Sequence, residues 1–231
     1  KICKMVGMKK VDIPERKRQR APSRRSLETR ARILDSAERQ FAERGFEGAS
    51  IREIATGAGT QVGLVHHHGE GKEELFRQVV ARRADELSSL RLSALEARKS
   101  DGSLDLSAIM TCFFEPYIAM ASRGDPQWLA YARLVAHVSA DPRWRDISLR
   151  HFDATAMIFI DEIARLYPKA RREQIAAGFV YSVAAMLALV TSRWRVGALS
   201  KDRDGCEAGR AHELAELVRY CAAGIAAAVD G

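Results

Sequence analysis

Apolar residues recur at intervals of three and four along most of the chain, which is the spacing of helices that each bury one face. From residue 104 onward no segment alternates as a strand would. Capping residues, glycines and prolines divide the pattern into nine predicted helices. They cover residues 26–45, 50–57, 60–69, 72–99 and 106–122, a helix that begins at Pro126, and residues 142–167, 171–197 and 212–229. The pattern therefore predicts an all-α fold.

The predicted helices divide the chain into three parts. Residues 1–25 contain two prolines among many basic residues and show no apolar period, which predicts a flexible basic arm. Residues 26–71 form a small unit of three helices, and residues 72–231 form a larger helical domain. The helix from Lys72 joins the two, and we expect it to be the only rigid element in contact with both.

The second and third predicted helices are short and closely spaced. Ser50, followed three residues later by Glu53, forms a capping box that predicts a helix start. The triplet Gly57-Ala58-Gly59 predicts a tight turn, after which Thr60 is placed to cap the next helix. Such a pair is a helix-turn-helix, whose second helix enters the major groove of DNA. An αα-hairpin in an ordinary helical bundle is the alternative.

The sequence around these two helices is specific enough to indicate a protein family. The stretch TRARILDSAERQFAERGFEGASIREIATGAG (residues 29–59), followed by Gly63, His68 and KEELF (residues 72–76), resembles the TetR family of bacterial transcriptional regulators. The resemblance covers about the first third of the chain. It implies a DNA-binding domain of three helices, followed by a larger helical domain in which effectors bind.

Four positions depart from the pattern of that family. It usually has an aliphatic residue at Thr60, tyrosine at His66, phenylalanine at Gly69 and a capping side chain at Gly71. Loss of a core aromatic costs a few kcal/mol unless another side chain fills the space, and a weaker cap costs about 1 kcal/mol. We therefore expect a recognition helix that is looser than usual for the family.

The start of the third helix holds the side chains best placed to contact bases. Gln61 can pair with both N6 and N7 of adenine, Val62 and Leu64 can touch a thymine methyl, and Gly63 allows close approach of the backbone. Basic and polar neighbours are suited to phosphates. The predicted DNA-binding residues are Arg24, Arg25, Ser50, Arg52, Thr60, Gln61, Val62, Gly63, Leu64, His66, His67 and Lys72. For each of them, a solvated surface position without DNA contact is the alternative.

Composition and charge support the same interpretation. The chain has 231 residues, 47% hydrophobic and 29% charged, which is typical of a globular protein and excludes a disordered or fibrous one. Its net charge of +7 is concentrated at one end, because residues 1–26 carry ten Lys/Arg and two acidic residues. Basic charge beside a helix-turn-helix indicates contact with phosphates. A solvating tail would show the same composition.

The cysteines and the hydropathy of the chain indicate in which cellular compartment the protein is found. The four cysteines, Cys3, Cys112, Cys206 and Cys221, are far apart and form no CxxC pair, and the N-terminus shows no secretory apolar region. We therefore expect a cytoplasmic protein with reduced thiols. Residues 174–192 lack charge and are almost long enough to span a membrane. Their glycine, serine and alanines favour a helix that is buried against a partner helix.

No pattern in the chain suggests catalysis. Neither a nucleophile with a base, nor paired carboxylates, nor a cluster with metal-ligand spacing is found, so we expect neither an enzyme nor a cofactor. The run His66-His67-His68 is no metal site, because adjacent helical side chains point about 100° apart and do not converge on one ion.

The larger domain is expected to hold an aromatic-rich interior. The resemblance implies that a small molecule binds there, although a plain core is the alternative for each residue. The predicted ligand-binding residues are Phe113, Phe114, Tyr117, Trp128, Arg133, His137, Met157 and Tyr181. Arg133 and His137 lie four apart and are suited to a carboxylate or polar head, unless Asp161 or Glu162 pairs with Arg133.

The last two predicted helices are rich in alanine and glycine. Small side chains let helices approach closely, which suits a four-helix dimer interface that includes Ala184 and Ala226. Together these features predict a homodimeric repressor that a small apolar or aromatic effector releases from a palindromic operator. The alternative is a DNA-binding protein whose larger domain docks another protein and binds no small molecule.

Overall fold

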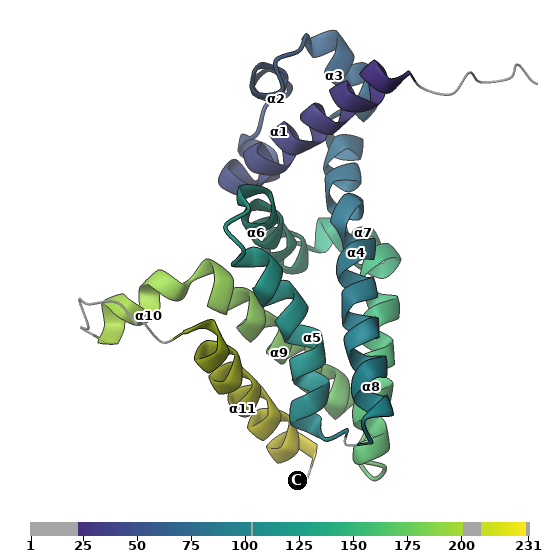
Figure 1. Ribbon diagram of the computed structural model, residues 1–231, viewed down its shortest axis with the longest axis vertical. Coiled ribbons are helices and arrows are strands. Elements are labelled where there is room, and N and C mark those ends of the chain that lie inside the picture. Colours follow the sequence, from purple (N-terminus) through teal and green to yellow (C-terminus); the bar gives the residue numbers. More distant parts are fainter. Residues whose placement is uncertain (1–22, 103, 201–208, 230–231) are drawn as a thin grey trace, which may run out of the picture.

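The computed structural model describes residues 23–102, 104–200 and 209–229. Within these ranges the chain forms eleven α-helices and one 3-10 turn, without a strand, so the all-α prediction is confirmed (Figure 1). Residues 1–22, which make up most of the predicted basic arm, lie outside the described residues, as does most of the polar segment before the last helix.

The N-terminal unit contains α1 (Arg24–Gly48), α2 (Ile51–Gly57) and α3 (Val62–Gly69), and it leads into the long α4 (Lys72–Ser100). In Figure 1, α1 to α3 lie at the top and α4 runs down one side of the molecule. Helix α1 begins earlier than predicted. Its N-cap is Ser23, whose hydroxyl accepts the N–H of Ser26.

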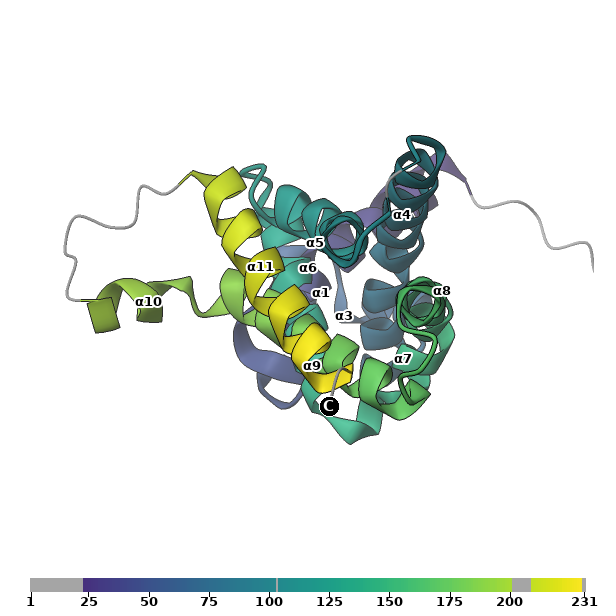
Figure 2. The same ribbon diagram turned by 90° about the horizontal axis from the view of Figure 1, so that it is seen from below.

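The C-terminal part contains α5 (Leu106–Ala121), α6 (Pro126–Ala140), η1 (Pro142–Trp144), α7 (Arg145–His151), α8 (Asp153–Leu166), α9 (Arg172–Thr191), α10 (Arg193–Ser200) and α11 (Arg210–Val229). Asp105 and Asp125 accept backbone N–H groups at the starts of α5 and α6. Helix α10 stands away from the body in both Figure 1 and Figure 2.

Two predicted helices are broken in the structure. The helix predicted over residues 142–167 is interrupted at Phe152, and the one over residues 171–197 at Ser192. Neither break carries the proline or glycine that would mark it in sequence. Phe152 packs against both hydrophobic cores of the protein, so tertiary contacts decide where α7 ends and α8 begins.

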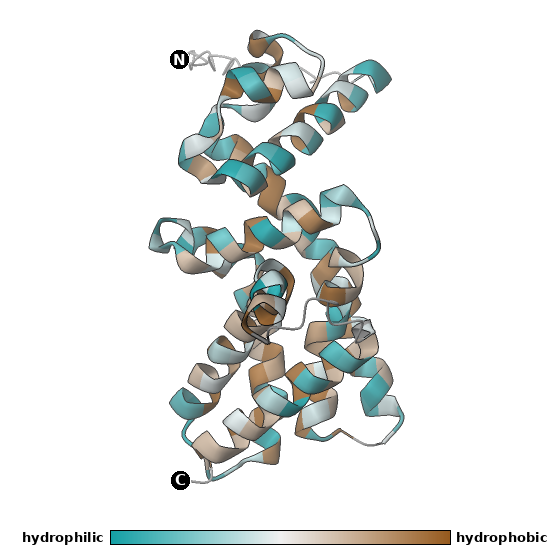
Figure 3. Cartoon of the chain, turned by 90° about the vertical axis from the view of Figure 1, so that its left-hand side faces the viewer, coloured by the Kyte–Doolittle hydropathy of each residue, from teal (hydrophilic) through white to brown (hydrophobic). Residues whose placement is uncertain are grey.

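The protein has two hydrophobic cores. The junction core is formed by side chains of helices α1 to α4. It also contains Leu134 and Val138 of α6, Trp144 of η1 and Ile147 of α7. The interior core lies between the C-terminal half of α4 and helices α5, α6, α8, α9 and α11. Figure 3 shows hydrophobic and hydrophilic segments alternating along the helices at both ends.

The junction core overturns one prediction. Helix α4 is not the only rigid connection between the two parts of the chain, because α1 packs along α6. In addition, the Trp144 ring packs against Phe46 and Phe76, and its centroid lies 4.9 Å from that of Phe46 and 4.3 Å from that of Phe76. The N-terminal unit therefore rests on residues that the sequence assigned to the other domain.

The inward face of α4 differs from the prediction at one position. The apolar pattern of residues 72–99 predicts that Leu90 faces inward, but Leu90 is 40% exposed, whereas the neighbouring Arg91 is buried. Leu87, Arg91 and Leu95 lie on one inward face at spacings of four. The aliphatic residue at position 90 suggested the wrong face.

Helix α9 is long and apolar enough to cross a membrane by length and composition, and one third of its most apolar window is buried. It packs against α11, α6 and α8. A Cβ at Gly178 would lie 3.0 Å from Ile225 Cγ1, so this glycine serves the close packing of α9 against α11 in one protomer.

The described cysteines, Cys112 and Cys221, are free and buried, and burial raises the pKa of both thiols. Cys3 and Cys206 lie outside the described residues.

Candidate DNA-binding surface and regulatory interior

The start of α2 forms the predicted cap. Ser50 Oγ accepts the N–H of Glu53 at 3.2 Å and donates to Glu53 Oε2 at 2.9 Å. Arg44 also pairs with this carboxylate. The hydrogen bonds from Ser50 and Arg44 lower the pKa of Glu53 below its usual value. These contacts fix the start of α2 against the end of α1.

The turn between α2 and α3 differs in one residue from the prediction. Gly59 has φ of 60°, a left-handed conformation that glycine adopts without a steric cost. The prediction that Thr60 caps α3 is wrong, because Gln61 occupies the N-cap position. The Gln61 side chain makes no capping hydrogen bond, so its amide is not used to hold the helix.

Helix α3 turns one face inward and the other toward solvent. Val65 is 1% exposed and Gly69 is buried, and these two residues seat the helix. The space beside Gly69 is occupied by Leu75, whose Cβ would lie 3.1 Å from an added Cβ, so no gap marks the missing aromatic. The exposed residues of α3 and its N-cap are Gln61, Val62, Gly63, Leu64, His66 and His67.

The residues predicted to contact phosphates lie around α3. Arg52 is exposed on α2 and Ser50 is partly buried at its cap. Lys72 Nζ donates to the carbonyl of Glu47 at 3.2 Å and lies over the Phe46 ring. Its ammonium therefore helps to hold the end of α1.

Arg24 and Arg25 were expected in a flexible arm, but they belong to the first turn of α1. Arg24 Nε pairs with Glu28 at 2.9 Å, and both arginines are exposed. The helix therefore fixes the direction in which they leave the backbone.

Four of the predicted ligand-binding residues lie in the interior core: Phe113, Phe114, Tyr117 and Trp128. The Phe113 ring packs edge to face against Phe159 and Phe179, with centroids 5.0 Å and 4.8 Å apart. The Tyr117 hydroxyl donates to the carbonyl of Ala132 at 2.9 Å. These side chains converge from α5, α6, α8 and α9.

The other four predicted ligand-binding residues do not lie in the interior: Arg133, His137, Met157 and Tyr181 are all exposed. On α6 the buried face carries Tyr131, Leu134, Val135 and Val138, so residues 133 and 137 fall on the opposite side. The alternative partners are engaged elsewhere. Asp161 pairs with Arg172, and Glu162 pairs with Lys99 and Arg165.

The interior core contains a cation that the sequence prediction missed. Arg91 is 6% exposed, its Nε donates to the carbonyl of Phe113 at 2.9 Å, and its guanidinium lies 3.7 Å from the centroid of the Phe113 ring. Burial lowers its pKa to about 10. The signal in the sequence was its place in the apolar series Leu87, Arg91, Leu95.

A second arginine, partly buried, lies at the domain junction. Arg83 Nε pairs with the fully buried carboxylate of Glu38 at 2.8 Å, and Gln127 Nε2 donates to the same carboxylate at 3.2 Å. Gln127 also accepts from Arg39 at 2.9 Å. Burial raises the pKa of Glu38, and the charge of Arg83 opposes this shift. The network joins α1, α4 and α6.

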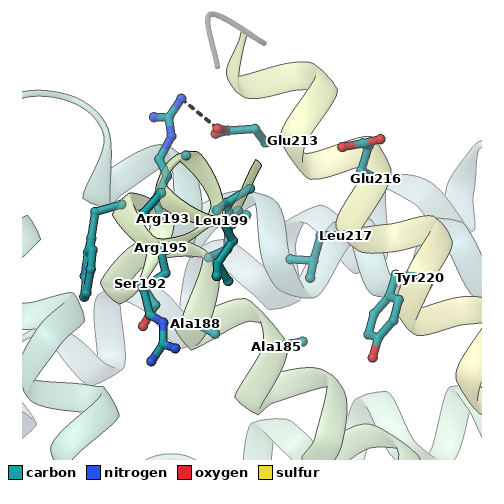
Figure 4. A pocket seen from close by; sticks show the side chains of 15 residues that line it. Ala185, Ala188, Ser192, Arg193, Arg195, Leu199, Glu213, Glu216, Leu217 and Tyr220 are labelled. Atoms are coloured by element: carbon teal, nitrogen blue, oxygen red, sulfur yellow. Dashed lines mark ion pairs between the residues drawn. The ribbon is translucent and has the colours of Figure 1, made fainter. Parts of the chain in front are cut away.

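Helices α9 and α11 leave an apolar surface exposed. Tyr181 is 72% exposed and Tyr220 74%, and Ala184 is exposed while Ala226 is partly buried. A groove of about 780 Å³ runs along the two helices, and one of about 880 Å³ lies where α10 leaves them, with Leu217 and Tyr220 on its wall (Figure 4).

The chain matches two family models. Residues 33–79 match the model described as bacterial regulatory proteins, tetR family, and residues 111–224 match the tetracyclin repressor-like C-terminal domain. The first match contains α2 and α3, and the second begins within α5 and ends within α11.

Curated relatives match smaller parts. The HTH-type transcriptional repressor AcnR from Corynebacterium efficiens is 39% identical over 66 residues, which is 27% of this chain and 35% of that protein. The repressor KstR2 from Rhodococcus jostii is 29% identical over 119 residues, which is 52% of this chain and 56% of that protein. The chain thus spans between about a third and little more than half of the length of these relatives.

Solved structures agree in fold. The crystal structure of a tetR family transcription regulator from Shewanella sp. PV-4 has a TM-score of 0.60 and 18% identity, and the match covers 84% of this chain and 95% of that one.

Proposed function

We propose that this chain, which belongs to the TetR family of bacterial transcriptional regulators, represses transcription as a homodimer in the cytoplasm and is released from a palindromic operator by a small-molecule effector. It is a DNA-binding transcriptional regulator. The observation that carries the proposal is the exposed face of α3, seated by Val65 and free to enter a major groove.

DNA recognition is proposed to depend on Gln61. Its side chain is exposed at the start of α3 and makes no capping hydrogen bond, so both its amide oxygen and nitrogen remain available to a base. Gln61→Ala should relax the preference at one position in each half-site, by about 1–3 kcal/mol. The measurement is selection of bound sequences from a random duplex pool.

Gln78→Ala, the same substitution on α4, serves as the control and should leave the selected sequence unchanged. A Gln61→Ala protein that selects the same motif as the wild type would contradict the assignment of α3 as recognition helix. A motif without two-fold symmetry would contradict the palindromic operator.

Dimerisation is proposed to use the exposed face of α9 and α11. Each protomer contributes two helices whose small and aromatic residues remain uncovered, which suits a four-helix interface. Ala184→Arg should give a monomer by sedimentation velocity, because the interface would bury an unpaired charge. Ala154→Arg, on the exposed face of α8, is the matched control. A dimeric Ala184→Arg protein would place the interface elsewhere.

Effector release is proposed to act through both connections between the domains. An effector that favours one position of α4 and α6 must weaken DNA binding by its coupling free energy, typically about 1–3 kcal/mol. The support is that α4 follows α3 directly and α6 packs along α1. The test is DNA release by a panel of fatty-acyl and aromatic compounds.

A protein-docking function remains the second candidate. The observation in its favour is α10, where Trp194, Val196 and Leu199 are exposed on a helix that stands away from the body. Replacing all three by serine should leave release by small molecules unchanged if the effector function is correct. Loss of regulation in cells, with DNA binding intact and no response to the panel, would favour docking.

A further inference from the structure

We propose that Arg91 anchors an anionic group of the effector, so that the regulatory domain takes a ligand with a carboxylate on an apolar body. The proposal rests on the effector function above and names the chemical class of its ligand. It concerns a residue of α4 inside the interior core that the sequence analysis did not include among the predicted ligand-binding residues.

The hydrogen bonds of Arg91 leave most of its donors unused. A guanidinium has five N–H groups. Nε donates to the carbonyl of Phe113 at 2.9 Å, and Nη2 lies 3.7 Å from the sulfur of Met186, a weak acceptor. Among the described residues no carboxylate pairs with Arg91. The cation is therefore held by a ring face, one carbonyl and a thioether.

Such an arrangement lowers the stability of the fold. A buried charge without a counter-charge is costly, and an apolar residue of similar volume is often at least as stable at such a position. The Phe113 ring at 3.7 Å offsets part of this cost. Burial alone gives no stability reason for an arginine in the apolar series Leu87, Arg91, Leu95. The bound anion of an effector would provide one, because it would pair with the guanidinium.

The surroundings define the ligand. A planar guanidinium binds a carboxylate through two parallel hydrogen bonds. Around it lie the Phe113 ring, the Met186 thioether and the phenols of Tyr117 and Tyr131, whose hydroxyls already donate to the carbonyls of Ala132 and Val80. These neighbours favour an apolar body behind the carboxylate, and the charge of Arg91 disfavours a cationic ligand.

Met186 is the contact that a ligand would replace. Its thioether is a weak acceptor on a flexible, unbranched side chain, which adapts to new neighbours more easily than a ring does. Exchange of this sulfur for a carboxylate oxygen would turn the weakest bond of Arg91 into a charge-assisted one. The bond to Phe113 would stay in place and keep α4 attached to α5.

The experiment compares three matched ligand series on the same carbon skeletons. Octanoate and 4-phenylbutyrate represent carboxylates, and the corresponding primary amides and amines represent neutral and cationic ligands. Binding to the full-length protein is measured by calorimetry without DNA, and DNA release is measured separately. We expect the carboxylates to bind and the amines not to bind.

Arg91→Met is the decisive variant. We expect it to unfold at the same temperature as the wild type or higher, to bind DNA as before, and to bind carboxylates about 10- to 100-fold more weakly. Arg133→Met, which removes an exposed arginine from α6, should change neither property. Arg91→Lys keeps the charge but not the planar fork, and we expect intermediate affinity.

Three outcomes would overturn the proposal: no binding of either carboxylate by the wild type, full carboxylate binding by Arg91→Met, or marked destabilisation of Arg91→Met, which would make the arginine structural. Carboxylate binding that fails to release DNA would instead contradict the proposed regulation and leave the Arg91 site standing. Binding and DNA release by the amides but not by the carboxylates would be an instance of the first outcome: it would retain an effector and exclude this anchor.

Discussion

Arg83 and Arg91 lie eight residues apart on α4, and both are largely buried, yet their surroundings differ. Arg83 pairs with the buried carboxylate of Glu38 and lies 4.8 Å from the centroid of the Trp128 ring. Arg91 lies 3.7 Å from the centroid of Phe113 and has no carboxylate partner among the described residues. One arginine belongs to the domain junction, and the other to the interior core.

The difference matches the separate roles that are proposed for the two regions. At the junction, Arg83, Glu38 and Gln127 satisfy one another and join three helices, as a connection that transmits movement requires. In the interior core, no described carboxylate pairs with Arg91, as the proposed anion site requires. Substitutions at the two places should therefore have opposite effects on stability.

The largest expected effect is at Arg83. Arg83→Met should lower the free energy of unfolding by about 3–5 kcal/mol, because it leaves the Glu38 carboxylate buried without its cation. Urea denaturation measures the change. The double variant Glu38→Leu/Arg83→Met removes both charges and should recover most of the loss. Equal stability of Arg83→Met and Arg91→Met would contradict the expected difference between the two arginines.

Trp144 tests whether the DNA-binding unit depends on the C-terminal part. Its ring belongs to the junction core although it lies in η1, between α6 and α7. Trp144→Ala should lower the free energy of unfolding by about 3 kcal/mol, because the cavity would open beside Phe46 and Phe76. Operator affinity should fall as well. Trp194→Ala, at an exposed tryptophan of α10, should have little effect on stability.

Gln127 tests the contacts of the domain junction with a smaller expected effect on stability. Its amide donates to the backbone of Asp35 and to Glu38, and accepts from Arg39, so it ties α6 to α1. Gln127→Ala should lower the free energy of unfolding by about 1–2 kcal/mol and weaken the coupling between effector and DNA. The coupling is measured as the ratio of operator affinities with and without effector. An unchanged ratio would assign transmission to α4 alone.

The smallest effect concerns Glu53, a carboxylate outside both regions. Hydrogen bonds from Ser50 and Arg44 hold its pKa below the ordinary value of 4.5. Because the pKa is lower in the folded protein, the stabilisation is present above about pH 4.5 and is lost as the pH falls through the lowered pKa. Glu53→Gln should flatten stability between pH 5 and pH 3, as thermal unfolding would show, whereas Glu43→Gln should not.

Several features could be predicted from local sequence. Asp105, Asp125 and Ser50 mark helix starts because a capping side chain reaches only two or three residues along the chain. The exposed face of α3 also follows from the sequence, since Val65 fixes which side turns inward. The resemblance of residues 29–76 gave the family, which the comparisons confirmed.

Other features could not be predicted, because they depend on residues distant in sequence. The predicted contact residues Arg133 and His137 share an apolar segment with Leu134 and Val138, and only the packing of α6 against α1 and α5 decides which of them are buried. The break at Phe152 has no local signal, because that ring contacts both cores.

The sequence by itself determined the all-α class, the starts of several helices, the helix-turn-helix and its exposed side chains, since these follow from periodicity and capping within a few residues. The tertiary structure alone decided that α1 rests on α6, that Trp144 completes the junction core, and that Arg91 faces the interior while Leu90 does not. The physical reason is rotation. Successive side chains of a helix point about 100° apart. Rotation of α4 about its axis therefore decides whether Leu90 or Arg91 faces the interior, and the side chains of the opposing helices fix that rotation.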